Sequence, residues 1–240
     1  MKTFVVLSDI QIPFQDHQSL ELVLKFIQDL KPYGVILNGD IVDCYSISDF
    51  NQDPWSQATI EREIVEAGQL MKRLSKYTTV KHWIGGNHED RWRRQIWKHG
   101  RFRGMFADFP RAFHMGTYGF TWRPYGEALR LGKLYVTHGS RVSKHSGMTA
   151  RSHFEKYGCS VMVGHSHRLG IYYHRNMGGT YAAYETGCLC SLTPEYDTYP
   201  DWHQGFAVVH VEDKGGLFHV QQIPILRRSV LWYGPKEYKL

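Results

Sequence analysis

The feature that most constrains the fold is an alternation of apolar strands with amphipathic helices in the N-terminal third of the chain. Strand-like apolar runs cover residues 3–9, 34–40 and 80–87. Residues 19–32 and 56–77, which lie between these runs, carry apolar side chains at helical spacing. A strand–helix–strand–helix–strand order predicts a parallel sheet joined by right-handed crossovers, with helices packed on its faces.

From about residue 129 the pattern changes to short strands joined by glycine-rich turns. The strand-like segments are residues 128–139, 160–165, 170–175, 180–189, 205–213 and 217–226. Residues 149–158 between them have a helical pattern. Such a series predicts a second, mixed or antiparallel sheet packed on the first. We therefore expect an α/β fold in which residues 1–240 form a single two-sheet domain with helices outside.

The composition is typical of a soluble globular protein, with 42% hydrophobic and 22% charged residues. No stretch approaches the ~20 apolar residues of a membrane span. The N-terminus lacks the basic flank and apolar core of a secretory signal. We therefore expect a cytoplasmic protein without membrane contact. The net charge of +6 and the sequence pI of about 9.1 are compatible with a polyanionic partner.

The cysteines predict reduced, buried thiols. Cys44, Cys159, Cys188 and Cys190 fit no zinc-finger spacing. Cys188 and Cys190 are too close in sequence to form a disulfide easily. Reduced thiols are also what a cytoplasmic location implies.

Polar side chains that can bind metals recur where the predicted strands end. They are Asp9 and Gln11 in "SDIQ", Asp40 and Asp43 in "NGDIVD", Asn87 and His88 in "GGNHED", His138 in "THGS", and His165 and His167 in "VGHSH". The carboxyl ends of parallel strands meet at one edge of a sheet, so we expect these groups to converge. Carboxylate, amide and imidazole together suit Mn²⁺, Fe²⁺ or Zn²⁺. Two such ions ~3.5–4 Å apart can share a carboxylate and clamp a phosphoryl group.

Each of these motifs also has an ordinary structural explanation. A single aspartate at a strand end usually caps a helix or a turn, and a single histidine is more often a core or surface residue than a ligand. The "GNHE" and "GHSH" sequences that follow apolar strands are more specific. The five motifs together, in this order, favour a metal site over the structural explanation.

This ordered set resembles the calcineurin-like metallophosphoesterase superfamily. The superfamily motifs D-x-H, G-D-x-x-D, G-N-H-[DE], a later His, and G-H-x-H stand here as "DIQ", "GDIVD", "GNHE", "THG" and "GHSH". Segments such as "DCYSISDF" and "GGTYAAYETGCLCSLTPEY" resemble a branch from tailed phages and prophages. The resemblance implies a four-layer αββα sandwich of two mixed sheets flanked by helices. For a phage-encoded protein it implies the host cytoplasm.

The resemblance also implies a role for each motif residue. The first metal would be surrounded by Asp9, Gln11, Asp40 and His167, and the second by Asp40, Asn87, His138 and His165, with Asp40 bridging the two. His88 would act on the leaving-group oxygen as an acid or a transition-state stabiliser. Asp43 would orient a neighbouring side chain by a hydrogen bond. Two divalent ions are expected, with Mn²⁺ first and Fe²⁺, Zn²⁺ or Ni²⁺ as alternatives.

Gln11 departs from the superfamily pattern, which has histidine at this position. An amide oxygen can bind a metal, but more weakly than imidazole and on a longer side chain. We expect Gln11 to face the first metal, directly or through water, and that metal to be weakly held or of an oxygen-preferring kind such as Mn²⁺. The alternative is that Gln11 is a turn residue and that three protein ligands hold the first metal.

Residues 91–127 form a segment rich in basic and aromatic residues, which predicts a substrate-wall insertion or an amphipathic helix. Its basic residues include Arg91, Arg93, Arg94, Lys98, Arg101 and Arg103, interleaved with Trp92, Trp97, Phe102 and Phe106. In a helix, Trp92 and Trp97 would lie in the core and the arginines in solvent. In a substrate wall, the arginines would bind phosphate and the aromatics would stack on bases. The candidate substrate contacts are Arg91, Arg94, Arg141, His145 and Arg168.

Two classes of function are compatible with these residues. The first is a dinuclear metal-dependent phosphoesterase in which a metal-activated hydroxide attacks phosphorus. Phosphodiesters or nucleic-acid-related substrates come first because of the basic segment, with phosphomonoesters of nucleotides or proteins as the alternative. The second class is a non-catalytic binding protein on the same fold. The expected partner is a phosphate ester, with nucleic acid as one form of it, and no obligatory protein partner is evident.

Overall fold

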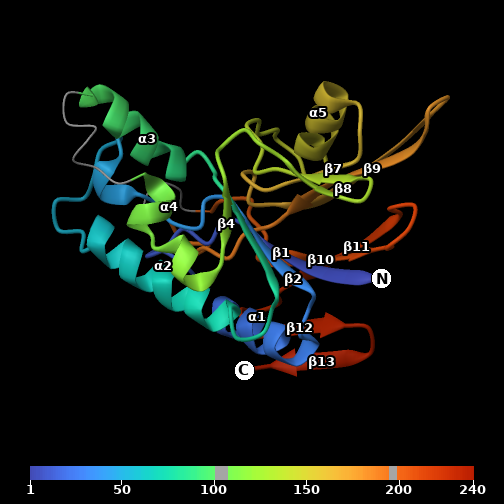
Figure 1. Cartoon of the computed structure of the whole chain (residues 1–240), viewed down its shortest axis with the longest axis horizontal. Coiled ribbons are helices and arrows are strands. Elements are labelled where there is room, and N and C mark those ends of the chain that lie inside the picture. Colours follow the sequence, from blue (N-terminus) through green and yellow to red (C-terminus); the bar gives the residue numbers. More distant parts are fainter. Residues whose placement is uncertain (101–107, 195–198) are drawn as a thin grey trace.

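Two mixed β-sheets, stacked face to face between helices, make up most of the protein (Figure 1). The structure is a computed structural model and describes residues 1–100, 108–194 and 199–240. The helices are α1 (His17–Leu30), α2 (Ile60–Leu74), α3 (Glu89–Lys98), α4 (Phe109–Ala112) and α5 (Met148–Tyr157), with short 3-10 helices η1 (Tyr45–Ile47) and η3 (Met115–Tyr118). Helices α1 to α4 lie on the first sheet, and α5 lies on the second (Figure 1).

The first sheet has the strand order β11-β10-β1-β2-β3-β4. Its strands are β1 (Lys2–Leu7), β2 (Gly34–Asn38), β3 (Val80–Ile84), β4 (Thr121–Arg123), β10 (Gly205–Val211) and β11 (Phe218–Pro224). Strands β1 to β4 are parallel, as the alternating sequence pattern predicts. Strands β10 and β11 extend the sheet in antiparallel pairing beyond β1.

The second sheet has the order β5-β6-β7-β9-β8. Its strands are β5 (Leu129–Leu131), β6 (Leu134–Val136), β7 (Val161–Val163), β8 (Leu169–Asn176) and β9 (Gly179–Thr186). Strands β6, β7 and β9 are parallel, and β5 and β8 are antiparallel to their neighbours. A separate hairpin of β12 (Val230–Tyr233) and β13 (Lys236–Lys239) packs beside α1, where Tyr233 and Tyr238 meet the ring of Phe26.

Alternation along the strands separates the protein into four layers. In β1, Val5 and Leu7 pack under helices α1 and α2, whereas Phe4 and Val6 face the second sheet. In β7, the central Met162 joins the core between the sheets, and its neighbours on either side pack against α5. Because central strands such as β2 and β7 are buried on both faces, they are continuous apolar runs apart from a terminal Asn38. The expected αββα sandwich is therefore confirmed.

The assignment of every later strand to the second sheet is wrong for β10 and β11. They pair with the first sheet because β1 leaves one edge open, and β10 has apolar side chains for both of its faces: Phe206 and Val208 toward the helices, and Ala207 and Val209 toward the second sheet. The single strand expected over residues 128–139 is instead the β5–β6 hairpin, which turns at Gly132 with φ +60°.

The placement of both tryptophans of α3 in the core is wrong for Trp97. Trp92 packs against Phe109 and Phe113, whereas Trp97 is 72% exposed. Trp97 instead lies under the guanidinium of Arg93, 4.1 Å from its Cζ to the ring centroid. The predicted positions Arg101, Phe102, Arg103 and Phe106 lie outside the described residues.

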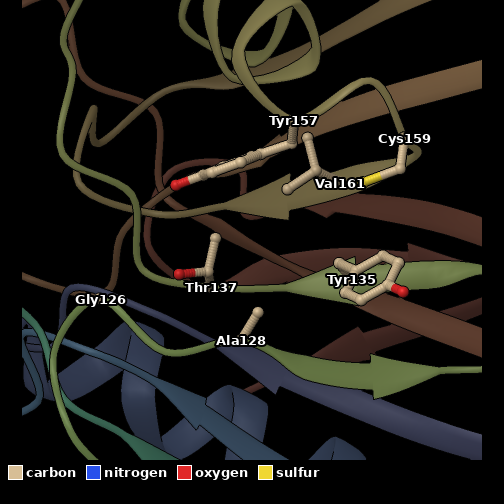
Figure 2. Close-up of a pocket in the computed structure, with 7 residues that line it drawn as sticks. All are labelled: Gly126, Ala128, Tyr135, Thr137, Tyr157, Cys159 and Val161. Atoms are coloured by element: carbon tan, nitrogen blue, oxygen red, sulfur yellow. The ribbon is translucent and has the colours of Figure 1, made fainter.

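A cavity of about 340 Å³ opens at the edge of the second sheet, between strands β6 and β7 and the end of α5 (Figure 2). Its lining consists of Gly126, Ala128, Tyr135, Thr137, Tyr157, Cys159 and Val161. None of the predicted site residues lines it. In the described parts of the chain, no helix combines the length and the apolar character that crossing a membrane requires. All four cysteines are free, and Cys44, Cys188 and Cys190 are buried.

Candidate metal and active site

The first sheet places three of the predicted motifs at its carboxyl edge. Asp9 follows the end of β1, Asp40 follows β2, and Asn87 follows β3. Because these strands are parallel and adjacent, their following loops emerge side by side. Backbone hydrogen bonds also tie the first two loops together, since the N–H groups of Asp9 and Gln11 donate to the carbonyls of Gly39 and Asp40.

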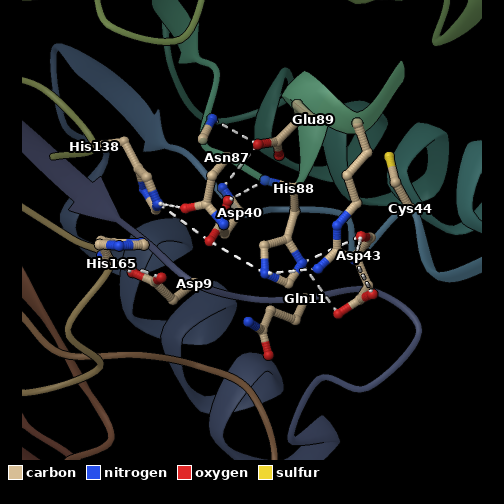
Figure 3. A network of polar contacts seen from close by, with 12 residues as sticks. Asp9, Gln11, Asp40, Asp43, Cys44, Asn87, His88, Glu89, His138 and His165 are labelled. Carbon is tan, nitrogen blue, oxygen red and sulfur yellow. Dashed lines mark hydrogen bonds and ion pairs between the residues drawn. The ribbon is translucent and has the colours of Figure 1, made fainter. Parts of the chain in front are cut away.

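The second sheet supplies the imidazoles. His138 follows the end of β6, and His165 and His167 follow β7. The two strands are parallel, and the N–H of Gly164 donates to the carbonyl of His138. Figure 3 shows His138 and His165 opposite the carboxylates of Asp9 and Asp40. The site therefore lies where the carboxyl ends of the parallel strands of the two sheets meet.

Backbone strain is concentrated at this meeting point. Asp9, Gln11, Asp40, His165 and His167 all have positive φ, between 51° and 67°. Non-glycine residues rarely adopt this left-handed conformation, and each costs free energy that the surrounding structure must offset. Strain of this kind clusters at functional sites, because it directs several side chains to one point.

Glycines beside the site provide room for the functional side chains. A Cβ at Gly86 would lie 2.1 Å from Oδ1 of Asp40, and one at Gly164 would lie 1.9 Å from Oγ of Ser8. Gly39 has a φ of +83°, and a Cβ there would also lie 2.4 Å from Nδ1 of His138. The glycines of "NGD", "GGN" and "VGH" are therefore required by the close approach of neighbouring side chains, and at Gly39 by the backbone turn as well.

One group of potential ligands surrounds Asp40. Nε2 of His138 lies 3.1 Å from Oδ2 of Asp40 and 3.2 Å from Oδ1 of Asn87. Asp40, His138 and His165 each offer a ligand atom, and these atoms lie within 4.8 Å of one another. A carboxylate, an amide oxygen and two imidazoles make a donor set that fits a divalent ion of intermediate softness.

The other group, which contains ligands predicted for the first metal, surrounds Asp9. Nε2 of His167 lies 3.1 Å from Oδ1 of Asp9 and 3.4 Å from Nε2 of Gln11. Asp9 is fully buried, and it accepts hydrogen bonds from the N–H of His165 and the hydroxyl of Ser8. Gln11 is 7% exposed, so its amide is enclosed beside His167. A half-turn of the amide would bring its oxygen to the same point.

Glu89 fixes the loop that carries Asp40. Its carboxylate accepts the backbone N–H of Asp40 at 2.9 Å, of Ile41 at 2.7 Å and of Gly86 at 2.6 Å. Glu89 is 2% exposed and begins α3. It stands in the "GNHE" motif, but its role could not be inferred from the sequence, because two of the three amides come from the loop after β2, which is distant in sequence. The sequence signal that could have drawn attention to Glu89 is an acidic residue next to loops whose buried backbone N–H groups need acceptors.

His88 lies between two carboxylates (Figure 3). Its Nδ1 is 3.2 Å from Oδ2 of Asp43, its Nε2 is 3.7 Å from Oδ2 of Asp40, and its backbone N–H donates to Asp40 at 2.9 Å. Nη1 of Arg91 lies 2.9 Å from Oδ1 of Asp43. Asp43 thus contacts both His88 and Arg91 and can fix the orientation of the imidazole.

The electrostatics of the site favour positive charge between the sheets. Burial alone raises the pKa of Asp40, but the imidazoles of His138 and His88 outweigh it and hold the pKa below its usual value. Burial lowers the pKa of His138, yet Asp40 raises it to about 10. Burial and the neighbouring His138 lower the pKa of His165 to about 4. The buried carboxylates therefore favour positive charge beside them, which either protonated imidazoles or divalent ions can supply.

Of the five candidate substrate contacts, Arg91 is the one that touches the catalytic candidates, with Nη2 3.4 Å from Nε2 of His88. Arg94 is half-exposed and pairs with Asp90. Arg141 and His145 are exposed in the loop before α5.

Arg168 is committed to protein contacts. Its Nη1 donates to the carbonyl of Ser143 at 2.7 Å and its Nε to the carbonyl of Asp201 at 2.8 Å. This arrangement ties the loop after His167 to two neighbouring segments.

Comparison with known proteins gives a family and several relatives. The sequence profile described as "Calcineurin-like phosphoesterase" matches residues 2–169. "Gene 54 protein" of Mycobacterium phage D29 is 29% identical over 94% of this chain and 94% of its own length. "Gene 54 protein" of Mycobacterium phage L5 is 28% identical over 88% of this chain and 89% of its own. The expected resemblance to phage proteins is confirmed.

Solved structures with a similar fold include Vps29 of Chaetomium thermophilum, 10% identical, with a TM-score of 0.48 over 93% of this chain and 98% of that one. Another is YfcE, described as a phosphoesterase from E. coli, which is 12% identical with a TM-score of 0.43 over 93% of this chain and all of that one.

Proposed function

The chain belongs to the calcineurin-like phosphoesterase family, and from this premise we propose that it is a dinuclear, metal-dependent phosphoesterase. The observation that carries the proposal is the presence of two ligand groups, around Asp40 and around Asp9, each of which joins a carboxylate of the first sheet to an imidazole of the second. The first ion would be held by Asp9, Gln11, Asp40 and His167, and the second by Asp40, Asn87, His138 and His165. When bound, divalent ions supply Lewis acidity that activates water and neutralises charge on the phosphoryl oxygens.

His88 is proposed as the group that assists the leaving group. Burial lowers the pKa of His88, but Asp40 and Asp43 outweigh this effect and raise it, which favours the protonated ring that a general acid needs. Asp43 accepts from Nδ1, which leaves Nε2 facing Oδ2 of Asp40. Arg91 holds Asp43 in place and brings a guanidinium within reach of a phosphoryl oxygen.

Phosphodiesters or nucleic-acid-related substrates are proposed first, with phosphomonoesters as the alternative. The support comes from exposed aromatic rings that line α3, since Trp97 is 72% and Phe50 77% exposed, and each lies under an arginine of that helix. Much of the positive charge of α3 is compensated, because Arg93 and Arg94 pair with Asp90. Stacking therefore supports this substrate class more than charge does.

The remaining proposals follow from the same site. Mn²⁺ is the proposed ion, because the group that would hold the first ion, around Asp9, is rich in oxygen donors. Residues 91–127 are proposed as a substrate wall within a single domain, and the cytoplasm as the location. A non-catalytic role is disfavoured, because Gln11 alone departs from the imidazole-rich pattern and His88 is present.

The test is a screen of small phosphate mono- and diesters, nucleotides and oligonucleotides with Mn²⁺, Fe²⁺, Zn²⁺ and Ni²⁺. We expect metal-dependent hydrolysis, with diesters preferred. Glu89→Gln, which keeps the size of the side chain but weakens the acceptor for three amides, should hydrolyse more slowly. If the wild-type protein binds ions but turns over none of these compounds with any metal, the non-catalytic alternative replaces the enzyme.

A further inference from the structure

Two buried thiols lie directly behind the proposed first metal group. Cys188 and Cys190 follow strand β9 and are 0% and 1% exposed. The backbone of this segment is hydrogen-bonded to the site, because the N–H of Leu189 donates to the carbonyl of Asp9 at 3.0 Å. The N–H of Cys188 donates to the carbonyl of His203, also at 3.0 Å. The thiols are therefore held in fixed positions relative to Asp9.

His167 presents its two ring nitrogens to different surroundings. Nε2 lies 3.1 Å from Asp9, on the metal side. Nδ1 lies 3.7 Å from Sγ of Cys190, on the protein side. The ligand atoms of His167, Cys188 and Cys190 lie within 4.8 Å of one another. A neutral imidazole that binds a metal through Nε2 must carry its proton on Nδ1, so the partner of Nδ1 decides which nitrogen is free.

The direction of the hydrogen bonds can be read from the far end of this cluster. Sγ of Cys188 lies 3.7 Å from the carbonyl of His203, and a carbonyl can only accept. Cys188 therefore donates its S–H to His203, and its sulfur is left to accept from Cys190, whose Sγ lies within 4.8 Å of it. Cys190 then donates to Cys188 and accepts from Nδ1–H of His167. The chain of donors leaves the lone pair of Nε2 facing Asp9 and Gln11.

His138 shows the same arrangement with a stronger acceptor. Its Nδ1 lies 2.8 Å from the carbonyl of Asn38, and its Nε2 faces Asp40. The two metal groups thus differ in the partner behind the imidazole as well as at Gln11. A thiol sulfur is a weaker acceptor than a carbonyl oxygen, so His167 is the less firmly oriented ligand.

We propose that Cys190 is a positioning residue for His167, which orients the imidazole and sets its tautomer so that Nε2 is available to the first metal ion. The proposal rests on the metal centre described above and adds a residue outside the superfamily motifs. It also assigns Cys188 as the donor that completes the chain to the backbone.

The test compares Cys190→Ala, which removes the acceptor, with Cys190→Ser, which retains a shorter one. Cys159→Ser, at the edge of the second sheet, is the matched control. Calorimetric titration of the metal-free proteins with Mn²⁺ measures the affinity of each ion, and NMR of histidine-labelled, Zn²⁺-loaded protein detects the Nδ1 proton of His167. In Cys190→Ala we expect about tenfold weaker binding of the first ion, unchanged binding of the second, and faster exchange of that proton. Cys190→Ser should fall between Cys190→Ala and the wild type.

Two results would overturn the proposal. One is unchanged first-ion affinity and proton exchange in Cys190→Ala. The other is a third, thiophilic ion in the wild type that is lost in both Cys190 variants, since Cys188, Cys190 and His167 would then be its ligands. Absence of hydrolysis by a wild-type protein that binds both ions would instead contradict the proposed function, and leaves the comparison of affinities intact.

Discussion

The position of His88 is compatible with a catalytic role that is separate from metal binding. Its neighbour Asn87 faces His138, whereas the ring of His88 lies between Asp40 and Asp43. A side chain placed in this way can transfer a proton without holding an ion.

His88→Ala should therefore keep both metal ions and lower kcat by roughly 10²–10⁴-fold, the usual contribution of a positioned acid–base group. Elemental analysis of metal content and steady-state kinetics with a small phosphate diester measure the two effects. His219→Ala, on the exposed face of β11, is the control. Loss of one ion in the His88 variant would assign the ring as a ligand.

Gln11 is the residue at which the two metal groups differ most in chemistry. Gln11→His should raise the affinity of the first ion and shift its preference toward softer ions such as Zn²⁺, because imidazole is a stronger and softer donor than an amide. Wild-type protein should hold its second ion tightly and its first only partly, so that added Mn²⁺ increases activity. Calorimetric ion titration of both proteins checks this. Two equally tight ions in the wild type, unchanged by the substitution, would contradict it.

The sequence predicts residues whose role is carried by their own side chain, and it misses those that act on backbone from elsewhere. Asp9, Asp40, His138 and His167 stand in motifs whose order indicates their chemistry. Glu89 acts by accepting backbone amides of its own loop and of the loop that carries Asp40, which is distant in sequence. Roles of this kind depend on which segments the fold brings together, and no local pattern encodes them.

At the scale of elements, helix α2 fixes the loop that follows Asp43. Glu63 is fully buried, and its carboxylate accepts the N–H of Cys44 at 2.6 Å and of Tyr45 at 2.9 Å. Cys44 has a φ of 53°, so the loop needs this support. Burial raises the pKa of Glu63 to about 8, although the two backbone hydrogen bonds oppose the change.

This shift makes the stability of the protein depend on pH. Glu63 titrates at about 4.5 in the unfolded chain and at about 8 in the folded protein, so the folded state binds the proton more tightly. Its contribution is fully present below pH 4.5 and is lost as the pH rises to about 8, with a slope of at most about 1.4 kcal/mol per pH unit. Glu63→Gln should flatten the dependence of the unfolding free energy on pH over this range. Glu61→Gln, exposed on the same helix, should not, and equal slopes in all three proteins would contradict the assignment.

Helix α3 carries the proposed substrate wall on its exposed face. Trp97→Ala should raise KM for a single-stranded oligonucleotide by about 5- to 150-fold, the equivalent of about 1–3 kcal/mol of stacking on one base, and leave KM for a small chromogenic ester unchanged. Trp232→Ala, on the distant β12–β13 hairpin, is the matched control. The same KM for the oligonucleotide in both variants would show that Trp97 is not part of the wall.

The sequence predicts helices and strands correctly where a single local pattern of apolar residues decides them. The strands and helices of the first half follow their periodicity, whereas the sheet that β10 joins depends on the free edge of β1. Trp97 lies near the end of α3, whose buried residues are confined to its first turn. Both outcomes are properties of packing between distant segments.

At the scale of the whole molecule, the site joins the two halves of the sandwich. The carboxylates and amides come from the first sheet and the imidazoles from the second, so bound ions would link the sheets to each other. Anything that binds the folded protein and not the unfolded chain stabilises the fold by mass action. Ions held in this way should therefore raise the free energy of unfolding of the whole domain.

Free Mn²⁺ at 100 times the dissociation constant of one site should stabilise the protein by about 2.7 kcal/mol through that site. A chelator should reverse the effect. Asp40→Asn should lose both this stabilisation and hydrolysis while it keeps its fold, because Asp40 is the carboxylate that the two ions would share. Asp29→Asn, at the exposed end of α1, is the control. Chemical unfolding with and without Mn²⁺, together with metal counting, measures the change. An Asp40 variant that retains wild-type metal content and turnover would show that the two ligand groups do not share a bridging residue, because the charge of that carboxylate would then be dispensable at the junction of the sheets.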